Sequence, residues 1–197
     1  MEFNRESYDK GKAWFYESEI CLRRSLIIRS NPIDTHGAIE ALQHCFELSC
    51  KSLYVMLDLP YPKEHDAAKK LDQVSEKMFQ IISGADQENG PPIESWIKKN
   101  SEYLKKIHET SIYGDEEKDI LASKLFSNEE FGDLMVNVTA IWSFIYHTLY
   151  NIGKQYNALT QEELKRYQEF SKLSILAYKN KTEYTKNFLK KIFSSNG

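Results

Sequence analysis

Apolar residues recur along most of the chain at spacings of three and four, which is the period of one face of an α-helix. The clearest run lies near residue 140, where spacings of four and three alternate as in antiparallel bundles and coiled coils. Its members are Phe131, Met135, Val138, Trp142, Ile145, Leu149 and Ile152. The pattern predicts a helix capped by Ser127 or Asn128, because short polar side chains accept hydrogen bonds from the first amides of a helix.

A second helix is predicted over residues 34–58. Six of its residues share one apolar face: Ile39, Leu42, Phe46, Cys50, Leu53 and Leu57. By the same spacing, another face carries Glu40, His44, Glu47, Lys51 and Tyr54. Pro60 and Pro62 are expected to end this helix, because proline lacks an amide donor and clashes with the preceding turn.

The first helix, predicted over residues 7–30, carries two apolar stripes. Two stripes indicate a helix covered on more than one side. One stripe repeats every seven residues and the other follows beside it: Trp14, Cys21 and Ile28, then Phe15, Leu22 and Leu26.

Further helices are predicted over about 64–83 and 92–114, and from 160 towards the end of the chain. Thr160 and Glu163 fit a capping box at the start of the last one. No segment alternates with period two between hairpin turns, so no strand is predicted. The predicted fold is therefore all-α, an up-down four- to five-helix bundle with an additional C-terminal helix. We divide it into a bundle over 1–156 and a C-terminal helical extension over 157–197, packed on the bundle or on a partner.

The composition is that of an ordinary globular protein, with 41% hydrophobic and 28% charged residues. A net charge of -3 provides no global basic field for nucleic acid. No apolar run is long enough for a membrane span, and the first residues show no export signal, so no membrane partner and a cytoplasmic location are expected. The three cysteines lie in helical settings and are expected to be reduced thiols.

Motifs that bind cofactors or metals are scarce. The chain has no Gly-rich phosphate loop, no Cys-x-x-Cys, no Glu-x-x-His pair and no His-Glu-x-x-His helix, so we predict neither a cofactor nor a metal. Arg29 and His36 are the weak catalytic candidates. An Arg that stabilises phosphate charge and a His that moves a proton from the 2′-hydroxyl can together cleave RNA. Pro32 interrupts the segment between them, so the two do not share a regular helix face.

Two pairs on the second helix, Glu40 with His44 and Glu47 with Lys51, are each one turn apart. The simpler interpretation is surface ion pairing, worth a few tenths of a kcal/mol. The functional interpretation is a polar patch in a groove.

The stretch "AIEALQHCFELSCKSLYVMLDLPYPKEHD" resembles the second helix of the HEPN (higher eukaryotes and prokaryotes nucleotide-binding) domain family. That family shows a Glu and a Lys four residues apart, a Pro-containing turn and a His-Asp pair. Here the corresponding positions are Glu47, Lys51, Pro62, His65 and Asp66. The segments "SIYGDEE", which contains Tyr113, and "FSNEEFGDLMVNVTAIWSFIYHTLYNI" occupy the places of the family's later turn and last bundle helix.

The resemblance implies a dimeric helical module with ligand contacts at Glu47, Lys51, His65, Asp66 and Tyr113. It also implies a possible nucleotide or RNA ligand and a nucleotidyltransferase-type antitoxin as partner, in a toxin-antitoxin or defence system. The chain departs from the family in having Ile112 before Tyr113, where the family has Arg. It also lacks the Arg and His pair that the ribonuclease branch carries near the start of a late helix, which favours binding over cleavage.

Three functions stay open on the sequence. The first is a HEPN-like homodimer that binds a nucleotide, RNA or a protein partner. The second is a metal-independent ribonuclease toxin. The third is a purely structural helical adaptor whose last helix docks a partner.

Overall fold

The computed structural model describes residues 3–29, 35–61, 69, 73–74, 77, 97–104 and 127–167. The long elements are α1 (Arg5–Arg29), α2 (Thr35–Met56) and α6 (Asn128–Gln155), and residues 97–104 and 161–167 form shorter helical stretches. Within these ranges the regular structure is α-helix and no strand occurs, so the predicted all-α helical bundle is confirmed at that level. The HEPN-like up-and-down arrangement stays a prediction. None of the helices in this part of the chain is long and apolar enough to cross a bilayer.

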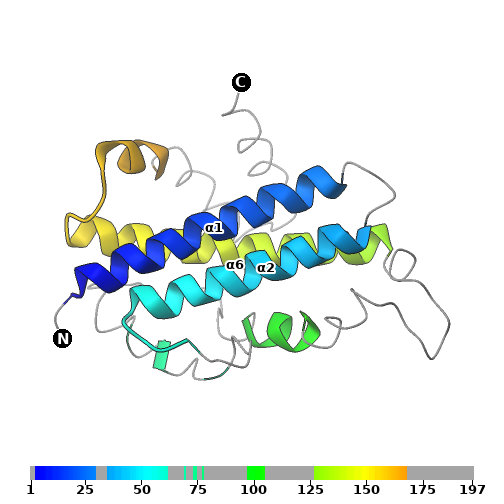
Figure 1. Ribbon diagram of the computed structural model, residues 1–197, viewed down its shortest axis with the longest axis horizontal. Helices are drawn as coiled ribbons and strands as arrows, with labels where there is room; N and C mark the ends of the chain where they lie inside the picture. The colour runs from blue at the N-terminus through cyan, green and yellow to red at the C-terminus, as the bar shows by residue number, and fades with distance from the viewer. Residues whose placement is uncertain are drawn as a thin grey trace, which may run out of the picture.

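The three long helices form two layers (Figure 1). Helices α1 and α2 lie side by side and antiparallel, and α6 runs behind them in the direction opposite to α1. The 97–104 helix lies on the side of α2 away from α1, and its Ile97 and Leu104 enter the same core. Because α2 contacts both α1 and α6 extensively, it is the central helix of the described fold.

Helices α1 and α2 approach closely because α1 presents a glycine to α2. A Cβ atom placed on Gly11 would lie 2.6 Å from both the Cβ and the backbone N of Met56. The same antiparallel register brings Ser7 to Asp58, whose side chains share a 2.6 Å hydrogen bond. Since the helices run antiparallel, this register also sets which residues meet at the other end of the pair.

Helices α1 and α6 are instead bridged by large aromatic side chains. The Phe15 ring lies 4.6 Å from the Trp142 ring, and Trp142 stacks on Tyr146 at 5.5 Å between centroids. The Trp142 indole N–H donates a 3.0 Å hydrogen bond to the Ser18 hydroxyl. This bond satisfies a polar group that would be costly to bury unpaired.

The predicted core faces are confirmed by burial. Every member of the six-residue face on α2 is at most 2% exposed, and every member of the seven-residue face on α6 at most 5%. On α1, Phe15 and Leu22 are fully buried, whereas Trp14, Cys21 and Ile28 are half-buried at the surface of the α1–α2 pair.

One residue of the predicted polar face was placed wrongly. Tyr54 is buried, and its hydroxyl donates to the backbone carbonyl of Lys69 at 2.6 Å. Its ring also lies edge-on to Tyr61, 5.5 Å away. An aromatic residue on the border between two helix faces follows the contacts available to it, which helical spacing alone does not reveal.

The ends of α2 and α6 share one capping geometry. Asp58 and Asn157 both take left-handed backbone conformations, with φ of 59° and 52°. In each case the next residue's amide bonds back to the carbonyl five residues earlier, Leu59 to Tyr54 and Ala158 to Gly153, as in a Schellman motif. Helix α2 therefore ends before Pro60, at the left-handed turn rather than at the prolines.

The start of α6 follows the prediction. The Ser127 side chain accepts from the backbone N–H of Glu130, and the Glu130 side chain accepts from the backbone N–H of Ser127. The box satisfies amides that the helix itself leaves unbonded.

Residues 158–167 fold back onto α1 and α6. The predicted capping box is present, since the Thr160 amide donates to the Glu163 carboxylate at 2.7 Å and the Glu163 amide donates to the Thr160 hydroxyl at 3.2 Å. The Glu163 carboxylate also accepts a 2.7 Å hydrogen bond from Tyr16 and pairs with Lys12 at 3.1 Å.

A second set of contacts fixes the far end of the same segment. Arg166 and Arg23 both bond to the buried carboxylate of Glu19. Tyr167 stacks on Tyr150, and its hydroxyl lies 3.0 Å from Nδ1 of His147. Residues 158–167 thus form what we call the clasp, joined to the helices largely by partly buried polar groups.

Candidate functional site

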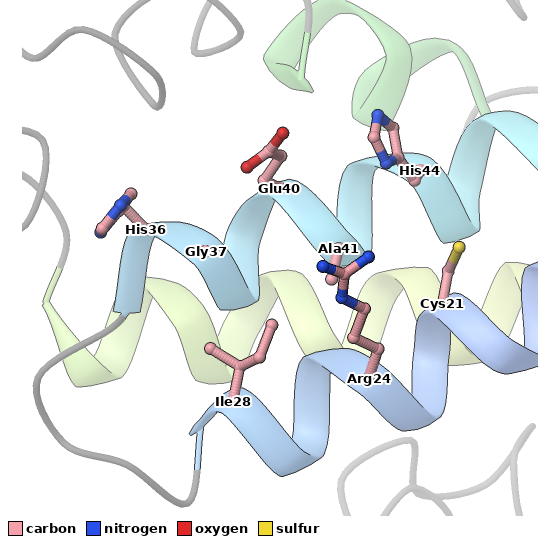
Figure 2. A pocket seen from close by; sticks show the side chains of 8 residues that line it. All are labelled: Cys21, Arg24, Ile28, His36, Gly37, Glu40, Ala41 and His44. Carbon is pink, nitrogen blue, oxygen red and sulfur yellow. The ribbon is translucent and has the colours of Figure 1, made fainter.

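An open cavity of about 240 Å³ lies between the C-terminal half of α1 and the N-terminal half of α2 (Figure 2). Both helices contribute to it because the antiparallel register brings these halves together. Its lining comprises Cys21, Arg24 and Ile28 from α1 and His36, Gly37, Glu40, Ala41 and His44 from α2.

Local spacing explains which side chains reach this cavity. On α1, Arg24 lies between Cys21 and Ile28 on the stripe that is left half-buried along the α1–α2 pair. On α2, His36, Glu40 and His44 are four residues apart and project from one side of the helix in Figure 2. The cavity itself exists because the facing α2 residues include Gly37 and Ala41, which are too small to fill the space.

The site combines one permanent positive charge with groups that donate and accept protons. Figure 2 shows Arg24 reaching from α1 to beside Ala41 of α2, at the centre of the lining. A guanidinium presents several N–H donors in a planar fork that matches phosphate or carboxylate oxygens. Histidine is the side chain best suited to moving protons near neutral pH, and His36 and His44 flank this position.

The thiol in the cavity is not set up as a nucleophile. Burial raises the pKa of Cys21, and the nearby Arg24 opposes this only in part. Burial raises the pKa of Cys45 and Cys50 as well. All three cysteines are free, as expected for reduced thiols. Since the thiolate is the reactive form, the chemistry of the cavity rests on its Arg, His and Glu side chains.

The residues predicted from sequence fall into three groups. His36 lines the cavity, together with Glu40 and His44 of the proposed polar patch. Arg29 is the last residue of α1, and its side chain lies outside the described residues.

Glu47 and Lys51 lie further along α2, beyond the cavity lining. The Lys51 ammonium lies 3.5 Å from the centre of the Trp14 ring, in a cation–π contact that spans the two helices. His65, Asp66 and Tyr113 lie outside the described residues. The grouping expected from the HEPN resemblance therefore stays a prediction.

Arg24 was not identified from the sequence as a site residue, although its helical spacing indicated one. It occupies the turn between Cys21 and Ile28, so it continues a stripe already identified as facing a neighbour. Which α2 residues it meets depends on the α1–α2 register, and that register is not encoded in the spacing within either helix.

A second cavity, of about 310 Å³, lies between the 97–104 helix and the first turns of α6. Its lining is Lys99, Asn100, Tyr103, Glu130, Asp133, Leu134 and Asn137. One of its carboxylates, Glu130, already serves the capping box of α6. This second cavity therefore presents fewer free groups to a ligand than its lining residues suggest. Across the described ranges, no three His, Cys, Asp or Glu side chains are grouped so as to hold a metal ion.

Comparison of the chain with protein-family models, curated proteins and solved structures gives no match. Function is therefore inferred from the geometry of the α1–α2 cavity and from the sequence resemblance.

Proposed function

We propose that this protein is a HEPN-like helical module that binds a phosphate-bearing ligand, a nucleotide or RNA, in the cavity between α1 and α2. The observation that carries the proposal is that Arg24 from α1 and His36 and His44 from α2 line a single open cavity. Three nitrogen-bearing side chains around one small space are suited to an oxyanion with several acceptor oxygens.

The other lining groups fit the remaining parts of such a ligand. Glu40 supplies an acceptor for a ribose hydroxyl or a base amino group. Ile28 and Ala41 give the lining an apolar part. A volume of about 240 Å³ accommodates a phosphate with its sugar, so the rest of the ligand would lie outside the cavity. Lys51 lies seven residues beyond His44, about 10 Å further along α2.

The test is a calorimetric and thermal-shift comparison of nucleotides with their phosphate-free nucleosides. Nucleotides should raise Tm and the nucleosides should not, because a ligand stabilises the state that binds it. Arg24→Gln should weaken nucleotide binding about 10- to 100-fold, since a charge-assisted contact is worth roughly 1.5–3 kcal/mol. Lys98→Gln, which removes one exposed positive charge outside the cavity, is the matched control. Equal binding by nucleosides, or equal loss in both variants, would contradict the proposal.

The same cavity supports a second candidate, metal-independent RNA cleavage. Here Arg24 rather than Arg29 would stabilise the phosphate, with His36 moving the 2′-hydroxyl proton. His36→Gln should then slow cleavage of a defined RNA about 10²- to 10⁴-fold in the presence of a chelator. Comparing Arg24→Gln with Arg29→Gln separates the two arginines, since only the arginine that contacts the phosphate should change the cleavage rate. RNA that stays intact at high protein concentration rules this candidate out.

A further inference from the structure

The clasp runs along α1 in the same direction and at a constant register. The Tyr16 hydroxyl bonds to Glu163, and one turn further along both segments Glu19 bonds to Arg166. In each pair the two residues are 147 positions apart. Parallel α-helices rise equally per residue, so this offset is kept for as long as both continue side by side. The described contacts therefore specify which residues meet beyond Tyr167, where the described part of the chain ends.

Helix α1 changes from polar to apolar where its contacts with the clasp end. Tyr16 and Glu19 meet the clasp through polar atoms. Ile20 and Ile27 follow on the same side of the helix, four and eleven residues after Tyr16, and are 57% and 64% exposed. Because the burial of aliphatic surface is favourable, this part of α1 suits an apolar occupant.

The chain that follows the clasp makes the same change. Residues 168–197 lie outside the described residues, and their sequence has no proline or glycine before the last position, so it predicts a continuing helix. The side that holds Glu163 and Arg166 continues at spacings of four and three through apolar residues. These are Phe170, Leu173 and Ala177.

The constant register brings the two apolar stretches together. An offset of 147 puts Phe170 opposite Arg23, between Ile20 and Ile27 along α1. The same offset puts Leu173 opposite the position just before Ile27. Polar residues thus meet polar residues within the clasp, and apolar residues meet apolar residues directly after it. A shift of either segment by half a turn would lose this match.

We infer that residues 168–177 continue the clasp as a helix that docks on α1 over Ile20 and Ile27. The occupant is this chain's own segment because it begins directly after a residue that is already docked. A short tether of this kind gives an effective concentration on the order of millimolar, which a second protein has to exceed. The inference goes beyond the ligand site. It assigns the first part of the C-terminal extension to the bundle, so that only residues after about 177 are left for a partner.

The first test is amide hydrogen exchange of the full chain, read by mass spectrometry on peptides that cover 168–177. Docking should slow exchange there at least tenfold relative to an unstructured chain. Ile27→Glu and Leu173→Glu should each remove most of this protection and leave that of α2 and α6 unchanged. Asn151→Glu, which adds the same charge at an exposed position on α6, is the control and should preserve it. An unprotected segment in the wild-type protein, or equal protection in Ile27→Glu and Asn151→Glu, overturns the inference.

Cysteine pairs test the register itself. Ile27→Cys with Leu173→Cys should form a disulfide within one chain under mild oxidation, because the inferred register brings the two positions within disulfide reach. Ile20→Cys with Leu173→Cys lies one heptad, about 10 Å, out of register and should not. Both pairs are made with Cys21→Ser, which removes the half-buried natural thiol. A matched pair that forms no disulfide, or forms it only between two chains, contradicts the docking, as does equal formation in the shifted pair.

Discussion

Gly11 of α1 lies against Met56 of α2 so closely that a Cβ on the glycine would fall 2.6 Å from both the Met56 Cβ and its backbone N. The contact involves backbone atoms, which cannot rotate away as the end of a long side chain can. The separation of α1 and α2, and with it the shape of the cavity between them, therefore depends on the missing side chain at residue 11.

Gly11→Ala is expected to destabilise the protein even though alanine favours helix by about 1 kcal/mol. Forcing the two helices apart costs about 1–3 kcal/mol in comparable overpacked sites, so a net loss of up to about 2 kcal/mol is expected in urea unfolding. Gly132 is the matched control, because nothing lies within 4 Å of a Cβ placed on it. Gly132→Ala should raise the unfolding free energy by about 0.5–1 kcal/mol. Equal effects of the two changes would show that helix propensity, not close packing, controls residue 11.

His147 should make stability fall with pH between 6.5 and 4. Burial lowers its pKa to about 4 in the folded protein, whereas the unfolded chain titrates near 6.5. Below pH 6.5 the unfolded state gains a proton that the folded state cannot accept, so the unfolding free energy drops, by up to about 3 kcal/mol at pH 4. His147→Gln should flatten this part of the curve in urea titrations, and His44→Gln, at an exposed position, should not. An unchanged slope in His147→Gln would contradict the assignment.

Glu163 should act in a lower pH range than His147 and in the same direction, with stability lost as the pH falls. Burial opposes ionisation, but hydrogen bonds from the Thr160 amide, the Tyr16 hydroxyl and Lys12 prevail and lower the pKa of Glu163 to about 2. A carboxylate held below its ordinary value stabilises the fold above pH 4.5, and that contribution is lost as pH falls towards 2. After a discount for partial solvent exposure, Glu163→Gln should lose about 1–2 kcal/mol at pH 7 and little at pH 2.

Glu162, the exposed neighbour of Glu163, provides the control for this prediction. Glu162→Gln changes the same charge one residue away and should alter stability by less than about 0.5 kcal/mol. Tyr16→Phe removes one donor to Glu163 and should cost about 1 kcal/mol at pH 7. If Glu162→Gln and Glu163→Gln behave alike, the clasp does not depend on the Glu163 carboxylate.

Asn157 should accept glycine with a gain in stability. Its φ of 52° lies in the left-handed region, where glycine has no steric penalty and a side chain costs about 1 kcal/mol. Asn157→Gly should therefore raise Tm slightly, and Asn157→Ala should lower the unfolding free energy by up to about 1 kcal/mol. A β-branched replacement, Asn157→Val, should be worse than Ala. The opposite order would mean that the turn after α6 is not held in this conformation.

Much of the helical framework was predictable because it depends on local spacing. The apolar faces of α2 and α6 were identified residue by residue, since helical period alone determines which side chains share a side. The capping boxes at Ser127 and Thr160 were also predictable, because each partner lies three residues away. The prediction was wrong for Tyr54, which sits at the border of a face, where neighbours from other segments decide burial.

The sequence by itself determined which helices form and which of their sides are apolar, because those properties repeat every three or four residues. Only the tertiary structure decided which sides meet. The α1–α2 register, fixed by the approach at Gly11, brings Arg24 to the same cavity as His36 and His44. The fold of the clasp brings Glu163 to Tyr16, a contact across 147 residues. Such contacts depend on the packing of whole helices, which no local spacing specifies.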